Sequence, residues 1–471
     1  MESKYSVIFI ENKNNSFMQV WLTVKRAFRE FLTLPTIILV VFILLAACSN
    51  MLDHNHQEWL NTVRALMKKT IFHSGGATGD LLGTIASSII TVLSLTITLL
   101  LIVVQQTASS MTTQVFDQFL RARHNQFYFG FFVGLSFYSL IVLASVNDSF
   151  NPIIGASVAF SLCVIAIYLL LILVYTTINE MRPAVIIGAI YDHIISARKK
   201  QLLFIAKTRS TPCFDGPCHV TIKTKGHGYI TNIYEKRIHS AIKKLKTEVE
   251  VVLSVSLGDY VSYEDEIGYV TSTSIEDGES VGYVVGEAIE IDLQRDITND
   301  PANGVKQLKM IAWTSISTAK QSQSPGLTIV RTLRDLLLRW SDTNHKGDND
   351  PYPIVYKDNV MPQLMDTFET LAVATTESMQ HENFKEIIRT FSSAYDRLSG
   401  ENKIRTEDII MRILSGMGDH MLTASLEDDL NILVKVLRNA GSIETANAVE
   451  MATNTLKQSV GRLNSRSTRI K

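Results

Sequence analysis

Residues 81–104, LLGTIASSIITVLSLTITLLLIVV, decide the fold class, because these 24 positions carry no charged side chain. At about 1.5 Å per residue a helix of this length is about 36 Å long, enough to cross a bilayer with some tilt. A core helix of a globular protein rarely stays uncharged for so long. Three other apolar runs reach or approach spanning length, so we expect four transmembrane helices: residues 34–49, 81–104, 127–146 and 153–176.

The overall composition excludes several classes of protein. The chain has 471 residues, of which 46% are hydrophobic, so it has ample apolar material to bury and is not a disordered chain. Lys+Arg number 45 and Asp+Glu 46, which gives a net charge of −1. This balance lacks the basic excess typical of nucleic-acid-binding proteins. Four cysteines are too few for a disulfide framework.

Basic residues near the ends of the spans predict the orientation of the chain. The loop 147–152 has no Lys or Arg, and the basic residues of the loop 50–80 lie towards its middle. Because Lys and Arg flank spans on the cytoplasmic side, we expect both termini to be cytoplasmic. The basic residues that carry this expectation are Lys25, Arg26, Arg29, Arg121, Arg123, Arg182, Arg198, Lys199 and Lys200.

The hydropathy pattern divides the chain into five parts. We expect a cytoplasmic N-terminus at 1–33 with an interfacial amphipathic helix, because apolar residues recur at helical spacing from Phe17 to Leu32. The membrane domain at 34–176 is followed by a helical connector at 177–218. A β-rich cytoplasmic subdomain at 219–292 has predicted strands at 219–223, 229–233, 249–255, 267–270 and 282–291. A helical subdomain occupies 293–471, so the fold class is an α-helical integral membrane protein with a cytoplasmic α+β region.

The second span carries a stripe of small and hydroxyl side chains on one face. Such a stripe allows close helix packing, and it could equally line a wet path in an oligomer. No span contains a charged residue, which argues against a proton relay. The third span has a GxxxG motif at Gly130 and Gly134, which predicts a close helix contact. The stripe consists of Gly83, Ser87, Thr91, Ser94, Thr98 and Gln105.

Motifs for catalysis or metal binding are weak. Cys213 and Cys218 with His219 resemble half of a metal site, but a second half is missing, and ordinary loop cysteines are the simpler interpretation. The polar loop 341–352 resembles a calcium loop, yet Lys346 and Pro353 stand where ligands are needed. Phosphate-binding, HExxH and GxSxG motifs are not found in the sequence. We therefore expect no enzyme activity, no catalytic residue, no cofactor and no metal.

The basic side of the segment 234–246 also has two interpretations. Ile238, Ile242 and Leu245 form its apolar side, and five Lys and Arg residues cover the other. A solvated helix face is the simpler interpretation, and contact with anionic lipid is the alternative.

Several stretches in the same order resemble a bacterial family of predicted membrane proteins, domain-of-unknown-function family 2254. The resemblance implies four spans, a cytoplasmic β-rich insert and a helical tail, and it implies no established activity. One departure concerns residues 317–323, where family members tend to carry Ser-Pro-Gly-x-Asn-Asp-Pro. The β-rich part also resembles a barrel-sandwich hybrid. The stretches that carry the family resemblance are 82–91, 119–125 (FLRARHN), 130–143, 228–230 (GYI), 257–261 (LGDYV) and 300–308 (DPANGVKQL).

These observations predict a multi-pass protein of the bacterial inner membrane. Our first hypothesis is an oligomeric channel or transport-related protein, in which the stripe of the second span is shared between copies and the cytoplasmic region is regulatory. The alternative is a non-transporting membrane-anchored sensor or scaffold. The expected partners are the lipid bilayer, other copies of the chain and an unidentified cytoplasmic partner, without nucleic acid.

Overall fold

The protein divides into two compact units in a computed structural model. We call Asn14–Ile186 the four-helix unit, and Ile187–Lys471 together with Met1–Lys13 the sheet-and-helix unit. The structure describes residues 4–10, 32–54, 74–110, 123–147, 150–295, 299–317, 324–341, 350–417 and 422–460.

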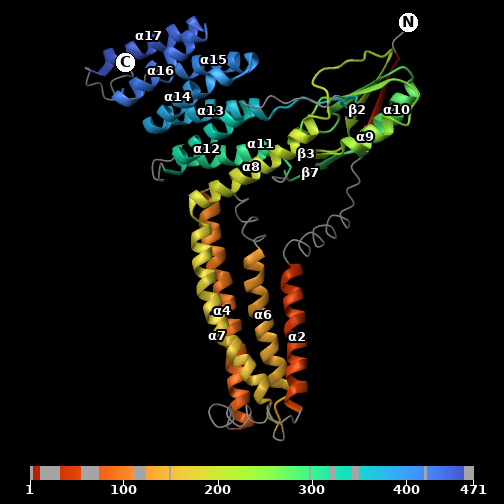
Figure 1. Ribbon diagram of the computed structural model, residues 1–471, viewed down its shortest axis with the longest axis vertical. Helices are drawn as coiled ribbons and strands as arrows, with labels where there is room; N and C mark the ends of the chain where they lie inside the picture. The colour runs from red at the N-terminus through yellow and green to blue at the C-terminus, as the bar shows by residue number, and fades with distance from the viewer. Residues whose placement is uncertain are drawn as a thin grey trace. The chain divides into compact units, whose positions relative to one another are not determined.

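Four long apolar helices make up the described part of the four-helix unit, as the sequence predicted (Figure 1). The helices extend beyond the predicted spans at most of their ends. Helix α6 contacts each of the other three, and it is the most buried of the four. The helices are α2 (Thr33–His54), α4 (Gly75–Ser110), α6 (Arg123–Ala144) and α7 (Ile153–Glu180).

Apolar side chains fill the centre of this unit and also cover much of its outside. Leu82, Phe132, Leu135 and Tyr138 are almost completely buried between the helices. On the outside, large apolar side chains such as Leu44, Leu95, Tyr168 and Leu171 are exposed. An outer surface of this kind suits lipid, which solvates apolar side chains as well as a protein interior does.

Two sheets form the β part of the sheet-and-helix unit. The five-stranded sheet has the order β1-β2-β6-β4-β8, with parallel pairing at both of its edges and antiparallel pairing inside. Its strands are β1 (Lys4–Ile10), β2 (Cys218–Thr224), β6 (Glu266–Ser272), β4 (Val249–Leu253) and β8 (Ile354–Val355). The antiparallel three-stranded sheet has the order β5 (Tyr260–Val261), β3 (Gly228–Ile233) and β7 (Ile289–Asp292).

The edge strands β1 and β8 were not predicted from the sequence. β1 comes from the first residues of the chain and pairs with β2 from Lys4 opposite Cys218 to Ile10 opposite Thr224. The N-terminal segment and the region after the fourth span therefore belong to one folded unit.

The predicted strand 282–291 is wrong over most of its length. Helix α10 (Ile275–Glu287) occupies it, and only β7 at the end is a strand. The glycines that suggested turns lie instead on the buried side of a helix. A Cβ at Gly278 would lie 2.7 Å from Ser272 Oγ and 2.9 Å from a methyl carbon of Val220, so glycine lets α10 approach the sheet closely.

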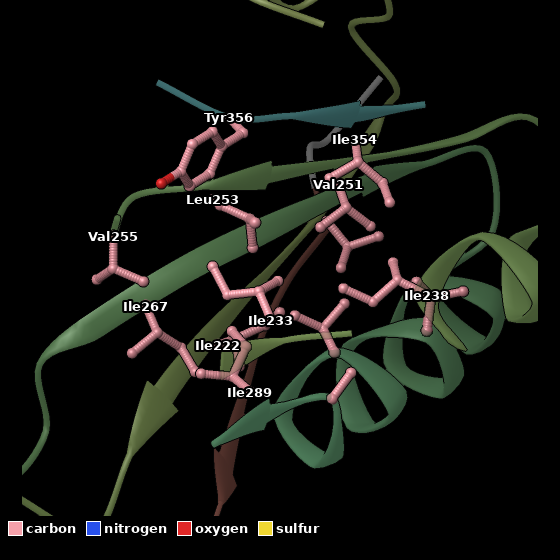
Figure 2. Packing of buried hydrophobic residues seen from close by; sticks show 14 of the residues in the cluster. Ile222, Ile233, Ile238, Val251, Leu253, Val255, Ile267, Ile289, Ile354 and Tyr356 are labelled. Carbon is pink, nitrogen blue, oxygen red and sulfur yellow. The ribbon is translucent and has the colours of Figure 1, made fainter. Parts of the chain in front are cut away.

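One apolar core joins the two sheets and their helices (Figure 2). Side chains from β2, β4 and β6 meet Ile233 and Ile289 from the small sheet, and Ile238 of α9 (Glu235–Ile242) packs against them. The alternation of buried and half-buried residues along β2 is the pattern expected of a strand with one face in a core. With α10 and α9 in this core, the barrel-sandwich shape is not confirmed.

Helices make up the rest of this unit. They begin with α8 (Pro183–Ile205), whose first residues belong to the four-helix unit. Within the part of the chain that the structure describes, five further α-helices follow β8. The helices after α8 are α11 (Pro301–Ser317), α12 (Ser324–Ser341), α13 (Val360–Glu377), α14 (His381–Ala394), α15 (Gly400–Leu414), α16 (Ala424–Asn439) and α17 (Ile443–Val460).

Candidate functional site

The stripe predicted from Gly83 to Gln105 belongs to α4, is called the α4 stripe from here on, and lies on the outside of the four-helix unit. Ser87, Thr91, Ser94, Thr98 and Gln105 are exposed, and Gly83 is half-buried. The buried side of α4 carries Leu82, Ile85, Ala86 and Ile89. At 100° per residue these two sets of positions lie on nearly opposite faces of the helix. The structure thus brings the stripe together as one surface. Gly83, at its start, lies beside Leu143 of α6, while the other five members are exposed.

Hydroxyl groups of the stripe bond to the backbone of their own helix. Thr91 Oγ1 donates to the Ser87 carbonyl at 2.8 Å, and Thr98 Oγ1 donates to the Ser94 carbonyl at 2.9 Å. Bonds of this kind let hydroxyl groups face lipid without losing a hydrogen bond. The oxygen lone pairs remain available to a second partner, such as water or a neighbouring copy.

Gly130 and Gly134 lie where α6 approaches α2. A Cβ at Gly134 would lie 2.6 Å from the ring of Phe42, and a Cβ at Gly130 would lie 2.9 Å from Ile38 Cδ1. Phe42 itself is buried and packs edge-on against Phe131. The two glycines therefore mark a close contact inside the four-helix unit rather than a contact between copies.

Asp53, part of the DHNH segment 53–56, caps a helix. Its carboxylate accepts hydrogen bonds of 2.9 Å from the backbone N–H groups of both Ile154 and Gly155, at the start of α7. Negative charge at a helix N-terminus is stabilising. The neighbouring His54 stacks on Phe150. These two residues thus have structural roles, and His56 lies outside the described residues.

In the sheet-and-helix unit, three of the stretches that resemble the family come together. Gly258 N donates to the Ile230 carbonyl at 2.8 Å, and Ile230 N donates to the Asp259 carbonyl at 2.9 Å. These bonds join 228–230 to 257–261. The third stretch, which begins at Asp300, reaches the same place through its side chain.

Asp300 and Arg295 form a buried ion pair beside that turn. Arg295 Nε donates to Asp300 Oδ2 at 2.8 Å, and its guanidinium lies 5.7 Å from the centre of the Tyr229 ring. Gly258 has φ +86°, and a Cβ there would collide with both Arg295 and Asp300. Burial raises the pKa of Asp300, although the Arg295 charge opposes this. Asp300 Oδ1 also accepts from Asn303 N at 3.1 Å, so it caps α11.

Buried polar residues of α8 connect the helical and β parts of this unit. Arg198, 5% exposed, donates to both carboxylate oxygens of Asp358, at 3.0 and 2.6 Å. The same guanidinium donates to Gln201 Oε1 at 2.6 Å and lies over the Trp340 ring. Two turns earlier, Tyr191 donates to Asp335 of α12.

A shallow open hollow lies beside these residues. Its wall includes Lys200 and Gln201 from the last turns of α8, Lys207 just after that helix, and Asn232 near the end of β3. Leu257, which precedes Gly258, and Asn299, which precedes Asp300, also line the hollow. The hollow therefore adjoins the place where the three stretches converge, and sequence patterns alone did not indicate it.

A buried carboxylate explains the loop that contains Cys213 and Cys218. Glu250 is 0% exposed and accepts hydrogen bonds from the backbone N–H groups of Cys213 and Phe214, at 2.9 and 3.1 Å. Its other oxygen accepts from Arg209 at 2.6 Å. Within the described residues, no three His, Cys, Asp or Glu side chains are grouped so that they could hold a metal ion.

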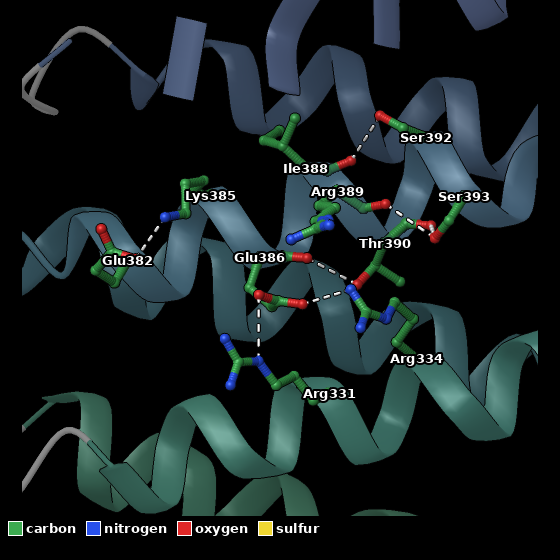
Figure 3. A network of polar contacts seen from close by, with 10 residues as sticks. All are labelled: Arg331, Arg334, Glu382, Lys385, Glu386, Ile388, Arg389, Thr390, Ser392 and Ser393. Atoms are coloured by element: carbon green, nitrogen blue, oxygen red, sulfur yellow. Dashed lines mark hydrogen bonds and ion pairs between the residues drawn. The ribbon is translucent and has the colours of Figure 1, made fainter. Parts of the chain in front are cut away.

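A second buried carboxylate joins α12 to α14 (Figure 3). The side chain of Glu386 is 2% exposed and pairs with Arg334 at 2.5 Å and with Arg331 at 3.3 Å. Both arginines remain partly exposed, so their charges reach water. This cluster holds two helices together.

Several sequence-based expectations lie outside the described residues. They concern the amphipathic segment before Leu32, most of the calcium-like loop, and 318–323 of the segment that departs from the family pattern. Ser324 and Gly326 begin α12, where Gly326 N donates to Ser315 Oγ at 3.2 Å.

The model of a family of predicted membrane proteins, DUF2254, matches residues 29–379, about three quarters of the chain. No curated protein and no solved structure matches the chain.

Proposed function

The chain belongs to the DUF2254 family of predicted membrane proteins, and from that premise we propose that it works as a homo-oligomeric channel or transport-related protein. One observation carries the proposal. The α4 stripe faces away from its own four-helix unit, while large apolar side chains such as Phe132 and Leu135 occupy the centre of that unit. A polar path would therefore run between copies, lined by the stripes of several α4 helices.

The pairing of β1 with β2 supports the proposed topology. Because residues 4–10 and 218–224 form one sheet, they lie on the same side of a membrane. An even number of crossings between them is then required, and four candidate spans satisfy this. We infer from the distribution of Lys and Arg that this side is the cytoplasm and that the membrane is the bacterial inner membrane.

Disulfide cross-linking tests the contact between copies. In a chain whose four cysteines are replaced by alanine, cysteine is introduced at Ser87, Thr91, Ser94 or Thr98. We expect cross-linked dimers at these positions after mild oxidation in the membrane. The exposed residues Leu95 and Ile97, which flank the stripe, serve as matched controls. Equal cross-linking at stripe and control positions would contradict the proposed interface.

Conductance tests the pore. The purified wild-type protein in planar bilayers is expected to conduct ions, and the double variant Thr91→Leu/Ser94→Leu is expected to assemble without conducting. Stability should not change, since both side chains are exposed and the stripe hydroxyls bond within α4. A control double variant, Leu95→Ile/Ile97→Leu, should conduct normally. Conductance that survives in the Leu variant contradicts pore lining by the stripe.

A membrane-anchored sensor or scaffold is the second candidate, and it is favoured by the same apolar centre of the single copy. In that case the sheet-and-helix unit would bind the partner and the helices would only anchor it. Deleting residues 1–13 and 201–471 together removes β1 along with its sheet. A scaffold then loses all function, whereas a pore keeps some conductance.

We propose no catalytic activity and no cofactor. The buried charged groups Arg198, Glu250 and Asp300 each have a structural partner, which leaves them without an evident chemical task. A specific metabolite that is converted by the purified protein would contradict this.

A further inference from the structure

The helices α11 to α17 of the sheet-and-helix unit are arranged in two rows. α11 contacts α13, α13 contacts α15 and α15 contacts α17, and in the same way α12 contacts α14 and α14 contacts α16. Contacts such as those of α11 with α12 and of α16 with α17 join the two rows. Helices that stack on the next but one along the chain are typical of solenoid proteins, whose extended surfaces bind other macromolecules. We call α11, α13, α15 and α17 the first row, and α12, α14 and α16 the second row.

The first row exposes far more apolar side chains than the second. Ile404 and Met411 lie two turns apart on α15, and Met310 and Trp313 one turn apart on α11, so each pair lies on one side of its helix. Among the described residues of the second-row helices, Ile432 is the only exposed large apolar side chain, and arginines of α12 reach water there instead (Figure 3). Exposed apolar residues that gather on one surface mark an interaction site. Those of the first-row helices are Met310, Trp313, Val373, Ile404, Met411, Ile443 and Met451.

The two ends of the first row carry charges of opposite sign. In the middle of the row, arginines of α15 pair with carboxylates of α13. At one end, α11 presents Lys309 and also Lys306, which precedes Met310 by one turn and shares its face. At the other end, α17 presents Glu444, which precedes Met451 by two turns. Within the described residues neither lysine nor Glu444 has an ion-pair partner. The first row therefore has a basic end and an acidic end.

This distribution of charge makes the first row complementary to itself. Two copies can share the surface about a two-fold axis in two ways. With the rows in the same order, Lys306 of one copy would face Lys306 of the other, and like charges repel. With the rows in opposite order, each α11 meets the α17 of the other copy, so that Lys306 faces Glu444. Each α13 then meets the other α15, which places Val373 opposite Ile404 and Met411.

A second copy suits this surface better than a membrane does. Glu377, Asp408 and Glu444 are exposed on α13, α15 and α17, and an anionic lipid surface would repel them. Three of the exposed apolar residues are methionines, whose flexible side chains adapt to the surface that they meet.

We propose that the first row binds the first row of a second copy in opposite order, about a two-fold axis between α13 and α15. The inference does not rest on the proposed channel, because the pair needs no contact at the α4 stripe. If both contacts form, every assembly contains an even number of copies.

Disulfide cross-linking between two differently tagged copies tests the order of the rows. In full chains whose native cysteines are replaced by alanine, one copy carries Met310→Cys and the other Met451→Cys. We expect a disulfide between these two copies after mild oxidation in the membrane. Two Met310→Cys copies should not link, because the two α11 helices lie at opposite ends of the pair. Ile432→Cys is the matched control, since Ile432 and Met310 are both 48% exposed and Ile432 lies on the second row. It should link to neither position.

An exchange of charges separates a specific pair from a chance contact. Lys306→Glu/Lys309→Glu in both copies should lower the yield of the disulfide between positions 310 and 451 at least about tenfold, because like charges then face each other. Adding Glu444→Lys to the same chains should restore the yield, which no misfolded variant would do.

The proposal is overturned if Met310→Cys links as well to itself or to Ile432→Cys as to Met451→Cys, or if Glu444→Lys restores nothing. It is also overturned if positions 310 and 451 do not link at all. Links between copies at Ser87 or Thr91 in that last case would leave the proposed channel standing, so the two ideas fail separately.

Discussion

The two units of the protein use opposite means of fixing their packing. In the four-helix unit, apolar side chains lie both inside and outside, and Asp53 holds the start of α7 through its carboxylate. In the sheet-and-helix unit, charged side chains are buried in the interior, and each of Arg198, Glu250, Asp300 and Glu386 has an ionic partner.

This difference shows what specifies each unit. Lipid does not distinguish an inward from an outward apolar residue, so contact geometry at small residues such as Gly134 must set the helix positions. In the other unit a buried charge tolerates only the arrangement that pairs it. We therefore expect the sheet-and-helix unit to depend on charge, and the four-helix unit on side-chain volume.

The largest effect is expected from Glu250→Ala, which breaks the charge-dependent unit. Arg209 and the N–H groups of Cys213 and Phe214 lose their acceptor. Removing one partner of a buried ion pair typically costs about 3–5 kcal/mol. Urea unfolding of the purified chain measures the loss. Glu248, which is exposed and lies two residues earlier, provides the control. Glu248→Ala should lower the free energy of unfolding by less than about 0.5 kcal/mol. Similar losses for both variants would refute the role of Glu250.

A smaller loss is expected from Gly134→Ala, which tests volume in the four-helix unit. The new methyl group would lie within 2.6 Å of the buried Phe42 ring, so α6 and α2 must separate. Overpacking of this kind costs about 1–3 kcal/mol. Gly83→Ala is the matched control on α4, because its Cβ would meet only Leu143, at 3.9 Å. The measurement is thermal unfolding in detergent. Equal melting temperatures for the two variants would show that contact volume does not set this packing.

The smallest expected effect is a pH dependence of the stability of the sheet-and-helix unit, through the carboxylate of Glu407. Burial alone would raise the pKa of Glu407, but hydrogen bonds from Tyr395, Ser442 and Thr445 outweigh it and hold that pKa below its ordinary value. Glu407 therefore stabilises the fold above its unfolded-state pKa, and this contribution is lost as pH falls through the lowered folded-state pKa. Tyr395→Phe removes one of these bonds and should cost about 1 kcal/mol at pH 7.

The difference between Tyr395→Phe and wild type should shrink as pH falls towards the folded-state pKa of Glu407. Urea unfolding at a series of pH values measures it, and the exposed Tyr283→Phe should show no difference at any pH. A loss for Tyr395→Phe that is independent of pH would contradict the role given to the Glu407 carboxylate.

The four spans could be predicted because length and apolar content alone are enough to recognise a membrane helix in a sequence. It did not settle what the α4 stripe faces, since a stripe that packs and a stripe that lines a path have the same period. The strand 282–291 was mistaken because glycines that suit a turn also suit a helix pressed against a sheet, as at Gly278. β1 was missed because its partner lies more than 200 residues away.

The buried ion pairs and the hollow could not be predicted, because their residues are far apart in the sequence. Arg198 and Asp358 are separated by 160 residues, and no local pattern connects them. Lys200 lies in α8 and Lys207 lies two residues beyond its end, so no single helical pattern connects them. Their amide neighbours come from β3 and from the segment before α11, which only folding brings together.

The most direct test of the outward-facing α4 stripe is the mass of the purified protein in a native-like membrane mimic. One chain has a mass of 52.7 kDa. The proposed function predicts a closed ring of several copies, with a mass at a single multiple of that value. A monomer at every protein concentration would contradict it, because the stripe of one copy cannot enclose a path.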